Sequence, residues 1–238
     1  MPRGRREDDG LAAILVVTGM IREAKCLGDG VEALCSGADV GSLRAALASR
    51  VDGAFAAVVS FGLAGGLDPE LAPGDLIVAT AVSSDAATFD THPALRRALL
   101  DGFAEAGLRA REGLVAGVDA PVMNAGDKAA LRAQTGAAIV DMESHIAAAF
   151  AAERGLPFAV VRAVSDPAGR ALPALAAKAV KPDGGVDIAL VLRELAKNPA
   201  QLGGLIAAGR DSGKAFAALG RCGGLVGQLL RLVLAHLG

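Results

Sequence analysis

The chain has 238 residues, of which 53% are hydrophobic and 21% are charged, so a single domain can bury a large core. Its formal net charge of −2 argues against nucleic acid as a partner, and the absence of Trp and Tyr argues against platforms that stack single-stranded bases. Three cysteines without metal-ligand spacing fit a reducing cytoplasm better than a disulfide framework.

The N-terminal region combines a charged tail with the first predicted strand. Three arginines within residues 1–10 precede the apolar run Leu11–Val17, as in a signal peptide, but three acidic residues separate them and the run is short. We therefore expect residues 1–10 to be a disordered tail and Leu11–Val17 to be a buried strand. Glu23 follows about one turn beyond the strand. No segment of the chain reaches the roughly 20 apolar residues that span a bilayer.

Strands and helices alternate through the middle of the chain. Apolar runs bounded by glycine and proline predict strands at residues 34–36, 54–67, 76–82 and 113–118. Apolar residues spaced by three or four predict helices at residues 42–49, 93–106 and 128–135, with Ser42 as a cap and residues 83–92 as a loop. This alternation predicts an α/β fold of three layers, in which a mixed, mainly parallel sheet lies between helices on both faces.

The strand at residues 54–67 is expected to run into a glycine-rich turn. Gly62, Gly65 and Gly66 remove side chains where the backbone must approach a ligand or another strand closely. Their G-x-x-G-G spacing differs from the G-x-G-x-x-G fingerprint of dinucleotide sites, which argues against a dehydrogenase.

Two short apolar runs that end in acidic residues organise the rest of the chain. These are VDMES, residues 140–144, and VVRAVSD, residues 160–166, separated by a predicted helix at residues 143–154. Open α/β sheets place their sites at the C-terminal ends of the strands. We therefore expect Asp141, Glu143, Ser165 and Asp166 to gather at one edge of the sheet and to form the active site.

The C-terminal region changes character after a predicted helix at residues 186–197. Residues 199–238 are rich in glycine and are expected to form a helical extension to a catalytic domain at residues 11–198. At about 100° per residue its polar side chains form one stripe beside a broad apolar surface. Contact with an anionic membrane surface and packing on the domain or on a second subunit both fit this pattern. The stripe consists of Arg210, Lys214, Arg221, Gln228 and Arg231, and the glycines are Gly220, Gly223, Gly224 and Gly227.

Residues 11–198 resemble the nucleoside phosphorylase and nucleosidase family, which cleaves the N-glycosidic bond of nucleosides. FGLAGGLDPELAPGDLIV resembles the family's ribose-side glycine turn, DMES its Met-Glu ribose clamp and VVRAVSD its terminal catalytic strand. Met20 followed by Glu23 is similar to the methylthioadenosine/S-adenosylhomocysteine nucleosidase branch. The short middle region and the 40-residue tail are most similar to hopanoid-associated phosphorylases, which are proposed to act on adenosylhopane.

The resemblance implies a role for several of these side chains. Cleavage of a ribosyl–adenine bond builds positive charge on the sugar and negative charge on the base, so an acid is needed at the base and carboxylates near the ribose. By resemblance, Asp166 with Ser165 beside it protonates adenine N7, and burial or neighbouring carboxylates must favour its protonated form. Glu143 holds the ribose hydroxyls and Glu23 orients the attacking water. The remaining substrate-binding positions implied are Leu63, Ala64, Gly65, Val122, Met123 and Met142.

Three departures from the family pattern concern the substrate pocket. Val122 stands where nucleosidases carry a Phe that stacks on adenine, and Leu63 stands where they carry a Ser. Family members commonly carry a lysine in the segment that corresponds to residues 36–39, and this chain has none there. These changes favour an apolar substituent at the 5′ position.

The nucleophile is either water or phosphate. Phosphate would need Arg22, Arg162 and the backbone around Gly19 and Gly62, but Arg162 fits equally well as a structural partner of a nearby carboxylate. We favour phosphorolysis because the resemblance does, with hydrolysis and non-catalytic nucleoside binding as alternatives. We expect no metal and no cofactor other than phosphate as co-substrate. The expected assembly is a homo-oligomer, with a dimer favoured, that is cytoplasmic or peripheral at the inner face of the membrane.

Overall fold

A computed structural model describes residues 12–37, 39–50, 53–173, 175, 181, 187–198 and 201–236. The predicted tail at residues 1–10 lies outside these ranges. The strands are β1 (Ala13–Thr18), β2 (Val31–Cys35), β3 (Phe55–Gly66), β4 (Leu76–Ser83), β5 (Thr88–Asp90), β6 (Ala110–Gly117), β7 (Ile139–Asp141) and β8 (Phe158–Asp166). The helices are α1 (Ile21–Ala24), α2 (Val40–Ala48), α3 (Pro93–Glu105), α4 (Ala125–Thr135), α5 (Ser144–Glu153), α7 (Ile188–Lys197) and α8 (Leu202–Leu234).

The described strands form one mixed sheet in the order β2-β1-β3-β7-β6-β4-β5. Strand β8 pairs with both β3 and β4, so β3, β7, β6, β4 and β8 close into a ring. Five of the eight strand pairs are parallel, which confirms the predicted mainly parallel sheet. Strands β7 and β8 each have one parallel and one antiparallel neighbour, and both pair with the end of β3.

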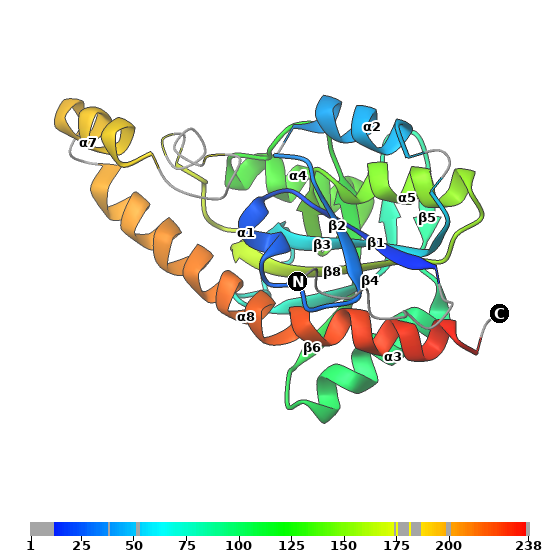
Figure 1. The fold of residues 1–238 in the computed structure, drawn as a ribbon. Coiled ribbons are helices and arrows are strands. Elements are labelled where there is room, and N and C mark those ends of the chain that lie inside the picture. Colours follow the sequence, from blue (N-terminus) through cyan, green and yellow to red (C-terminus); the bar gives the residue numbers. More distant parts are fainter. Residues whose placement is uncertain are drawn as a thin grey trace, which may run out of the picture.

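Helices cover both faces of the sheet, as predicted (Figure 1). Successive side chains of a strand point to opposite faces. Ile14 and Val16 of β1 therefore pack with α3 and α8, whereas Leu15 and Val17 pack with α2 and α5. Because the side chains alternate between the two faces, they form two cores, one on each side of the sheet. Each fully buried aliphatic side chain in these cores contributes about 1.5–3 kcal/mol to folding.

The predicted strand at residues 54–67 is confirmed by β3, and the strands that approach Gly62, Gly65 and Gly66 closely are β7 and β8, so the turn expected at these glycines is absent. Two further sequence-based predictions of local structure are wrong. The predicted loop at residues 83–92 contains the short strand β5. Helix α2 is capped by Asp39, whose carboxylate accepts a hydrogen bond from the Ser42 backbone N–H at 2.6 Å, so Ser42 is the donor and not the cap.

Helix α8 is 33 residues long and runs from a projecting end beside α7 to the far side of the sheet (Figure 1). Its second half is part of the core, because side chains from Ala215 to Leu234 pack with β8 and α3. Packing on the catalytic domain, one of the two alternatives left by the sequence, therefore holds for this half. By length and composition α8 also qualifies to span a membrane, contrary to expectation, although 44% of its most apolar window is buried within the fold.

Candidate active site

A pocket of about 520 Å³ opens where the C-terminal ends of β3, β7 and β8 meet α1 and α8. The ring of strands brings these ends together although they are far apart in sequence. All but three of the predicted site residues line this pocket, and the exceptions are Met123, Arg162 and Gly62. The predicted residues that line it are Gly19, Arg22, Glu23, Leu63, Ala64, Gly65, Val122, Met142, Glu143, Ser165 and Asp166.

Glu23 is held in place from two sides. Its Oε2 accepts a hydrogen bond from the Met20 backbone N–H at 2.8 Å, and its Oε1 accepts one from the Leu63 N–H at 2.8 Å. The side chain of Glu23 thus links the short helix α1 to strand β3 and is only 2% exposed. Each carboxylate oxygen has a second lone pair, so Glu23 retains the capacity to accept from a water molecule in the pocket.

Two glycines make room for the carboxylates. A Cβ atom on Gly62 would lie 2.7 Å from both Glu23 Oε1 and Arg162 Nη1, and a Cβ atom on Gly19 would lie 2.7 Å from Glu143 Oε1. Gly19 and Gly62 therefore accommodate the acidic cluster, and their predicted role in holding phosphate is not supported.

Arg162 lies behind the pocket with no exposed surface. Its Nε lies 2.7 Å from Asp141 Oδ2, as an ion pair without a directed hydrogen bond, and its Nη2 lies 3.3 Å from Glu143 Oε2. The remaining donors reach Ser60 Oγ at 2.6 Å, Ser144 Oγ at 3.2 Å and the Leu63 carbonyl at 3.2 Å. Of its two predicted roles, the structure supports that of a structural partner for the carboxylates.

More carboxylates than cations lie around Arg162, and the excess negative charge affects the protonation of these carboxylates. Burial raises the pKa of Glu143 to about 7, opposed by the Arg162 cation and reinforced by the negative charges of Asp141 and Glu23. Burial likewise raises the pKa of Glu23, and Arg162 opposes this shift. Near neutral pH the carboxyl of Glu143 therefore lies between its two protonation states, so it can both donate hydrogen bonds to hydroxyl groups and accept them.

Asp166 also lines the pocket, and two polar side chains contact it. Ser165 Oγ lies 2.6 Å from Asp166 Oδ1, and the Nζ of Lys128 on α4 pairs with Asp166 Oδ2. The neighbour of Asp166 is thus a cation, whereas the sequence-based expectation was burial or further carboxylates. Lys128 was not predicted, because one lysine in an alanine-rich helix gives no sequence signal.

Part of the pocket lining is apolar. Leu172, Val191 of α7, and Leu205 and Phe216 of α8 line it together with Val122. This wall was also missed, because its residues follow the last recognised motif and reach the pocket only through the tertiary fold. Arg22 closes one side, with its guanidinium 3.9 Å from the ring centroid of Phe216. The Met123 carbonyl accepts a hydrogen bond from the Leu172 N–H at 2.8 Å, so Met123 supports this wall from outside.

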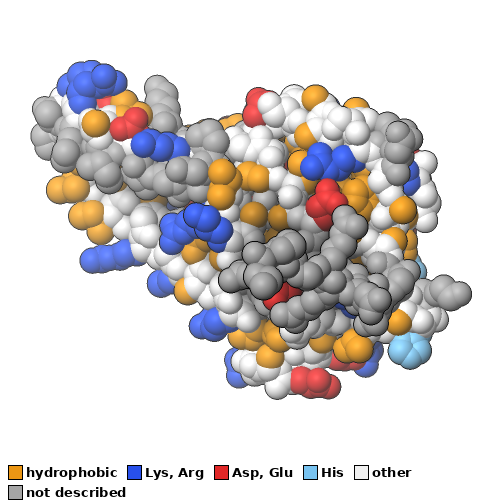
Figure 2. Space-filling view, viewed as in Figure 1, with side chains coloured by type: hydrophobic (Ala, Val, Ile, Leu, Met, Phe, Trp, Pro, Cys, Tyr) orange, Lys and Arg blue, Asp and Glu red, His pale blue; other side chains and the backbone are white. Residues whose placement is uncertain are grey.

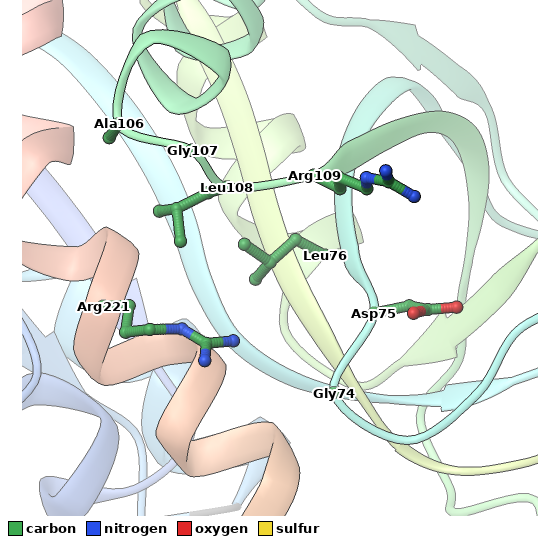
Figure 3. A pocket seen from close by; sticks show the side chains of 8 residues that line it. All are labelled: Gly74, Asp75, Leu76, Ala106, Gly107, Leu108, Arg109 and Arg221. Atoms are coloured by element: carbon green, nitrogen blue, oxygen red, sulfur yellow. The ribbon is translucent and has the colours of Figure 1, made fainter.

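A second pocket of about 440 Å³ lies between the turn before β4, the α3–β6 turn and α8 (Figure 3). Asp75, Arg109 and Arg221 are its charged residues, and Arg221 points across it from α8. It contains no predicted site residue. Within the described part of the chain, no group of three or more His, Cys, Asp and Glu side chains is arranged to hold a metal ion.

Comparison with known proteins identifies one family. The family model described as the phosphorylase superfamily matches residues 13–206. A search of curated proteins gives no match.

Among solved structures, the fold is similar to a 5′-methylthioadenosine/S-adenosylhomocysteine nucleosidase from Neisseria meningitidis in complex with methylthio-immucillin-A. The TM-score is 0.66 at 18% identity, over 93% of this chain and 100% of that one. A Helicobacter pylori nucleosidase of the same kind gives 0.66 at 15% identity, over 96% and 100%. Futalosine hydrolase of Helicobacter pylori gives 0.57 at 18% identity, over 66% and 89%. These likenesses show a shared fold.

Proposed function

The chain belongs to the phosphorylase superfamily, whose members cleave glycosidic bonds, and we propose that it releases adenine from a 5′-modified adenosine. The observation that carries this proposal is that Glu23, Glu143 and Asp166 line one pocket. A protein that only binds nucleosides needs no acid at the base and no second carboxylate near the sugar. The solved structures of similar fold are 5′-methylthioadenosine/S-adenosylhomocysteine nucleosidases, which fits a nucleoside in this pocket.

Each of the three acids has a role that follows from its surroundings. Glu143, with its raised pKa, faces the pocket beside Met142 and hydrogen-bonds the ribose hydroxyls. Positive charge develops on the ribose as the bond to the base breaks, and the acidic cluster stabilises it. Asp166, with Ser165 beside it, interacts with N7 of the departing adenine and delivers its proton.

Water is the nucleophile that the geometry favours. Of the two arginines predicted to bind phosphate, Arg162 is buried against carboxylates and Arg22 stacks on Phe216. A phosphate dianion placed beside Glu23 and Glu143 would be repelled at close range. We therefore propose hydrolysis assisted by Glu23, and phosphorolysis, which the sequence favoured, is the second candidate because Arg22 lines the pocket.

The apolar part of the pocket lining supports a hydrophobic 5′ substituent. Leu172, Val191 and Leu205 line the same pocket as the three acids and offer no charged partner to a polar group. Burying apolar substituent surface there gains about 25 cal/mol per Å². We propose adenosylhopane as the substrate, in line with the resemblance to the hopanoid-associated branch, with methylthioadenosine as the smaller alternative.

A membrane-held substrate would need an enzyme that works at the membrane. We propose that the protein is cytoplasmic and touches the inner leaflet through exposed residues of α1 and of the first half of α8, namely Ile21, Arg22, Leu202, Ile206 and Arg210. Its three apolar members are 43%, 49% and 46% exposed, although aliphatic side chains of this size are usually buried. Apolar side chains flanked by cations suit anionic lipid headgroups.

The test of the reaction measures adenine by chromatography. We expect the enzyme to release adenine from adenosylhopane, and more slowly from methylthioadenosine, with or without phosphate, and to leave a free 5′-modified ribose. The Asp166→Asn variant should be at least ~10²-fold slower with its fold intact. No adenine from either substrate would refute the proposal, and a strict need for phosphate with a ribose 1-phosphate product would replace hydrolysis by phosphorolysis.

A further inference from the structure

Asp211 is a buried acidic side chain on the half of α8 that projects from the body. It is 7% exposed, and it is the one buried residue among residues 202–214, all of which the structure describes. Its Oδ2 pairs with Nη1 of Arg170, which belongs to the post-β8 segment, residues 167–173. A carboxylate is seldom buried without a partner, so the ion pair explains why Asp211 lies against this segment.

The post-β8 segment is also held by elements other than α8. The Nζ of Lys128 on α4 donates hydrogen bonds to the carbonyl oxygens of Pro167 at 3.0 Å and of Arg170 at 3.3 Å. The Leu172 N–H donates to the Met123 carbonyl at 2.8 Å, and Leu172 lines the pocket. The segment is therefore a fixed support, and the ion pair of Arg170 connects α8 to it.

A second contact joins α8 to the same segment. A Cβ atom on Gly204 would lie 3.4 Å from Cγ of Pro173, so the helix backbone meets the proline ring there. Gly204 and Asp211 are seven residues apart, which places them on one side of the helix, about two turns from each other. At about 100° per residue, the pocket-lining residues of α8 form the adjacent side of the helix. These residues are Leu205, Ala208, Gly209, Ser212 and Phe216.

We infer that Arg170 and Asp211 are positioning residues that hold this side of α8 against the pocket and so determine which 5′ substituent the enzyme accepts best. Apolar surface is buried only while the lining stays in place, so a long apolar substituent gains from the ion pair, whereas a methylthio group gains little. The preferred substrates are adenosines with a long apolar 5′ substituent. This inference rests on the proposed function, which assigns the apolar lining to that substituent.

The experiment compares adenine release from 5′-methylthio-, 5′-butylthio- and 5′-octylthioadenosine by the full-length wild type and its variants. In the wild type, each methylene buried against the lining should raise kcat/KM about fourfold, so log(kcat/KM) should increase with chain length. In Arg170→Met, kcat/KM should fall at least ~10-fold for the octylthio substrate and less than about threefold for the methylthio substrate, which has little surface to lose.

The slope of log(kcat/KM) against chain length separates positioning from stability. If the ion pair only stabilises the fold, Arg170→Met should reduce kcat/KM by one factor for all three substrates and leave the slope unchanged. Exchanging the charges in Arg170→Asp/Asp211→Arg should restore the slope at least in part, because the pair is rebuilt with opposite polarity. Arg97→Met is the matched control, since Arg97 Nε lies 2.7 Å from Asp101 Oδ2 in an exposed ion pair of α3, and it should keep the wild-type slope.

The outcomes distinguish this inference from the proposed function. Release of no adenine by the wild type from any of the three substrates would refute the proposed function. An active wild type with a slope of zero, or a folded Arg170→Met variant with the wild-type slope, would overturn only the positioning role. Should Arg170→Met fail to fold, Asp211→Asn decides in the same way, because the amide keeps the shape of the side chain and removes its charge.

Discussion

At the scale of single residues, the charge balance around Arg162 determines how the protein responds to pH. Burial raises the pKa of Glu143 from 4.5 to about 7. In the unfolded chain this carboxyl ionises near 4.5, so between pH 4.5 and 7 the folded state binds more protons than the unfolded state. The free energy of unfolding therefore falls as the pH rises through this window and is constant above it.

Glu143→Gln should remove the part of this pH dependence that comes from Glu143, whereas the raised pKa of Glu23 keeps its own contribution. The amide does not ionise, so the variant lacks the loss of stability on the order of 2–3 kcal/mol that Glu143 should cause in the wild type between pH 5 and pH 8. Urea unfolding at the two pH values measures the difference. Glu105→Gln, on the exposed end of α3, is the control and should behave as wild type. An identical pH dependence in wild type and Glu143→Gln would show that Glu143 ionises normally.

The predictable residues are those with a local pattern. Glu143, Ser165 and Asp166 could be predicted because each follows an apolar strand, where an acid or hydroxyl must meet the sheet edge. For Arg162 the sequence left two roles open, phosphate binding and pairing with Asp141 or Glu143, and only the fold, which brings these carboxylates to its side chain, decides for the second. Lys128 was missed because its partner Asp166 is 38 positions away.

At the scale of elements, helix α8 matters because it approaches the backbone of the site very closely. A Cβ atom on Gly223 would lie 2.2 Å from the Cys26 carbonyl oxygen. This oxygen belongs to the backbone and cannot move away as the end of a flexible side chain could. The Cys26 N–H in turn donates to the Glu23 carbonyl at 2.9 Å. The contact at Gly223 therefore links the core half of α8 to Glu23, the residue that we propose orients the nucleophile.

Gly223→Ala should destabilise the protein and Gly220→Ala should not. The first forces α8 away from Cys26, at about 1–3 kcal/mol for overpacking, and should lower kcat/KM through Glu23. The second meets no atom within 4 Å and gains up to about 1 kcal/mol of helix propensity. Thermal unfolding and adenine release measure both. Equal stability of the two variants would show that the close contact is absent.

The elements themselves were largely predictable, but their closure was not. Hydrophobic periodicity and the glycines that bound apolar runs located most strands and helices to within a few residues. The pairing of β8 with β4, which closes the ring, joins segments about 85 residues apart in sequence through Leu76 and Ala163, and no local pattern encodes it. The same closure turned the expected glycine turn into the continuous end of β3.

At the scale of the whole molecule, α7 and the first half of α8 project from the body, and the second half of α8 runs along it (Figure 1). Lys and Arg side chains lie along the outer edge of α8, and hydrophobic side chains lie at its projecting end (Figure 2). Leu205 lines the pocket from one side of the helix, whereas Leu202 and Ile206 are exposed. One helix thus offers an apolar wall to the substrate and an apolar, basic edge to the outside.

This arrangement predicts salt-sensitive binding to anionic vesicles. The wild type should co-sediment with phosphatidylglycerol vesicles at low salt and less with phosphatidylcholine vesicles, since each cation near an anionic surface contributes about 1 kcal/mol that salt screens. Leu202→Glu/Ile206→Glu should abolish binding, whereas it should leave the rate with methylthioadenosine unchanged because neither side chain lines the pocket. Leu232→Glu is the control, because Leu232 is 66% exposed at the opposite end of the same helix.

The competing occupant of this surface is a second copy of the chain, and the same variants separate the two. A membrane surface requires the wild type to bind vesicles whatever its oligomeric state, and the double variant to keep that state in size-exclusion chromatography. If the wild type is a dimer that binds neither kind of vesicle, and the double variant is a monomer, Leu202 and Ile206 belong to a subunit interface. A lipid-linked substrate would then have to reach the apolar wall of Leu172, Val191 and Leu205 without help from the bilayer, which would favour the smaller, water-soluble methylthioadenosine.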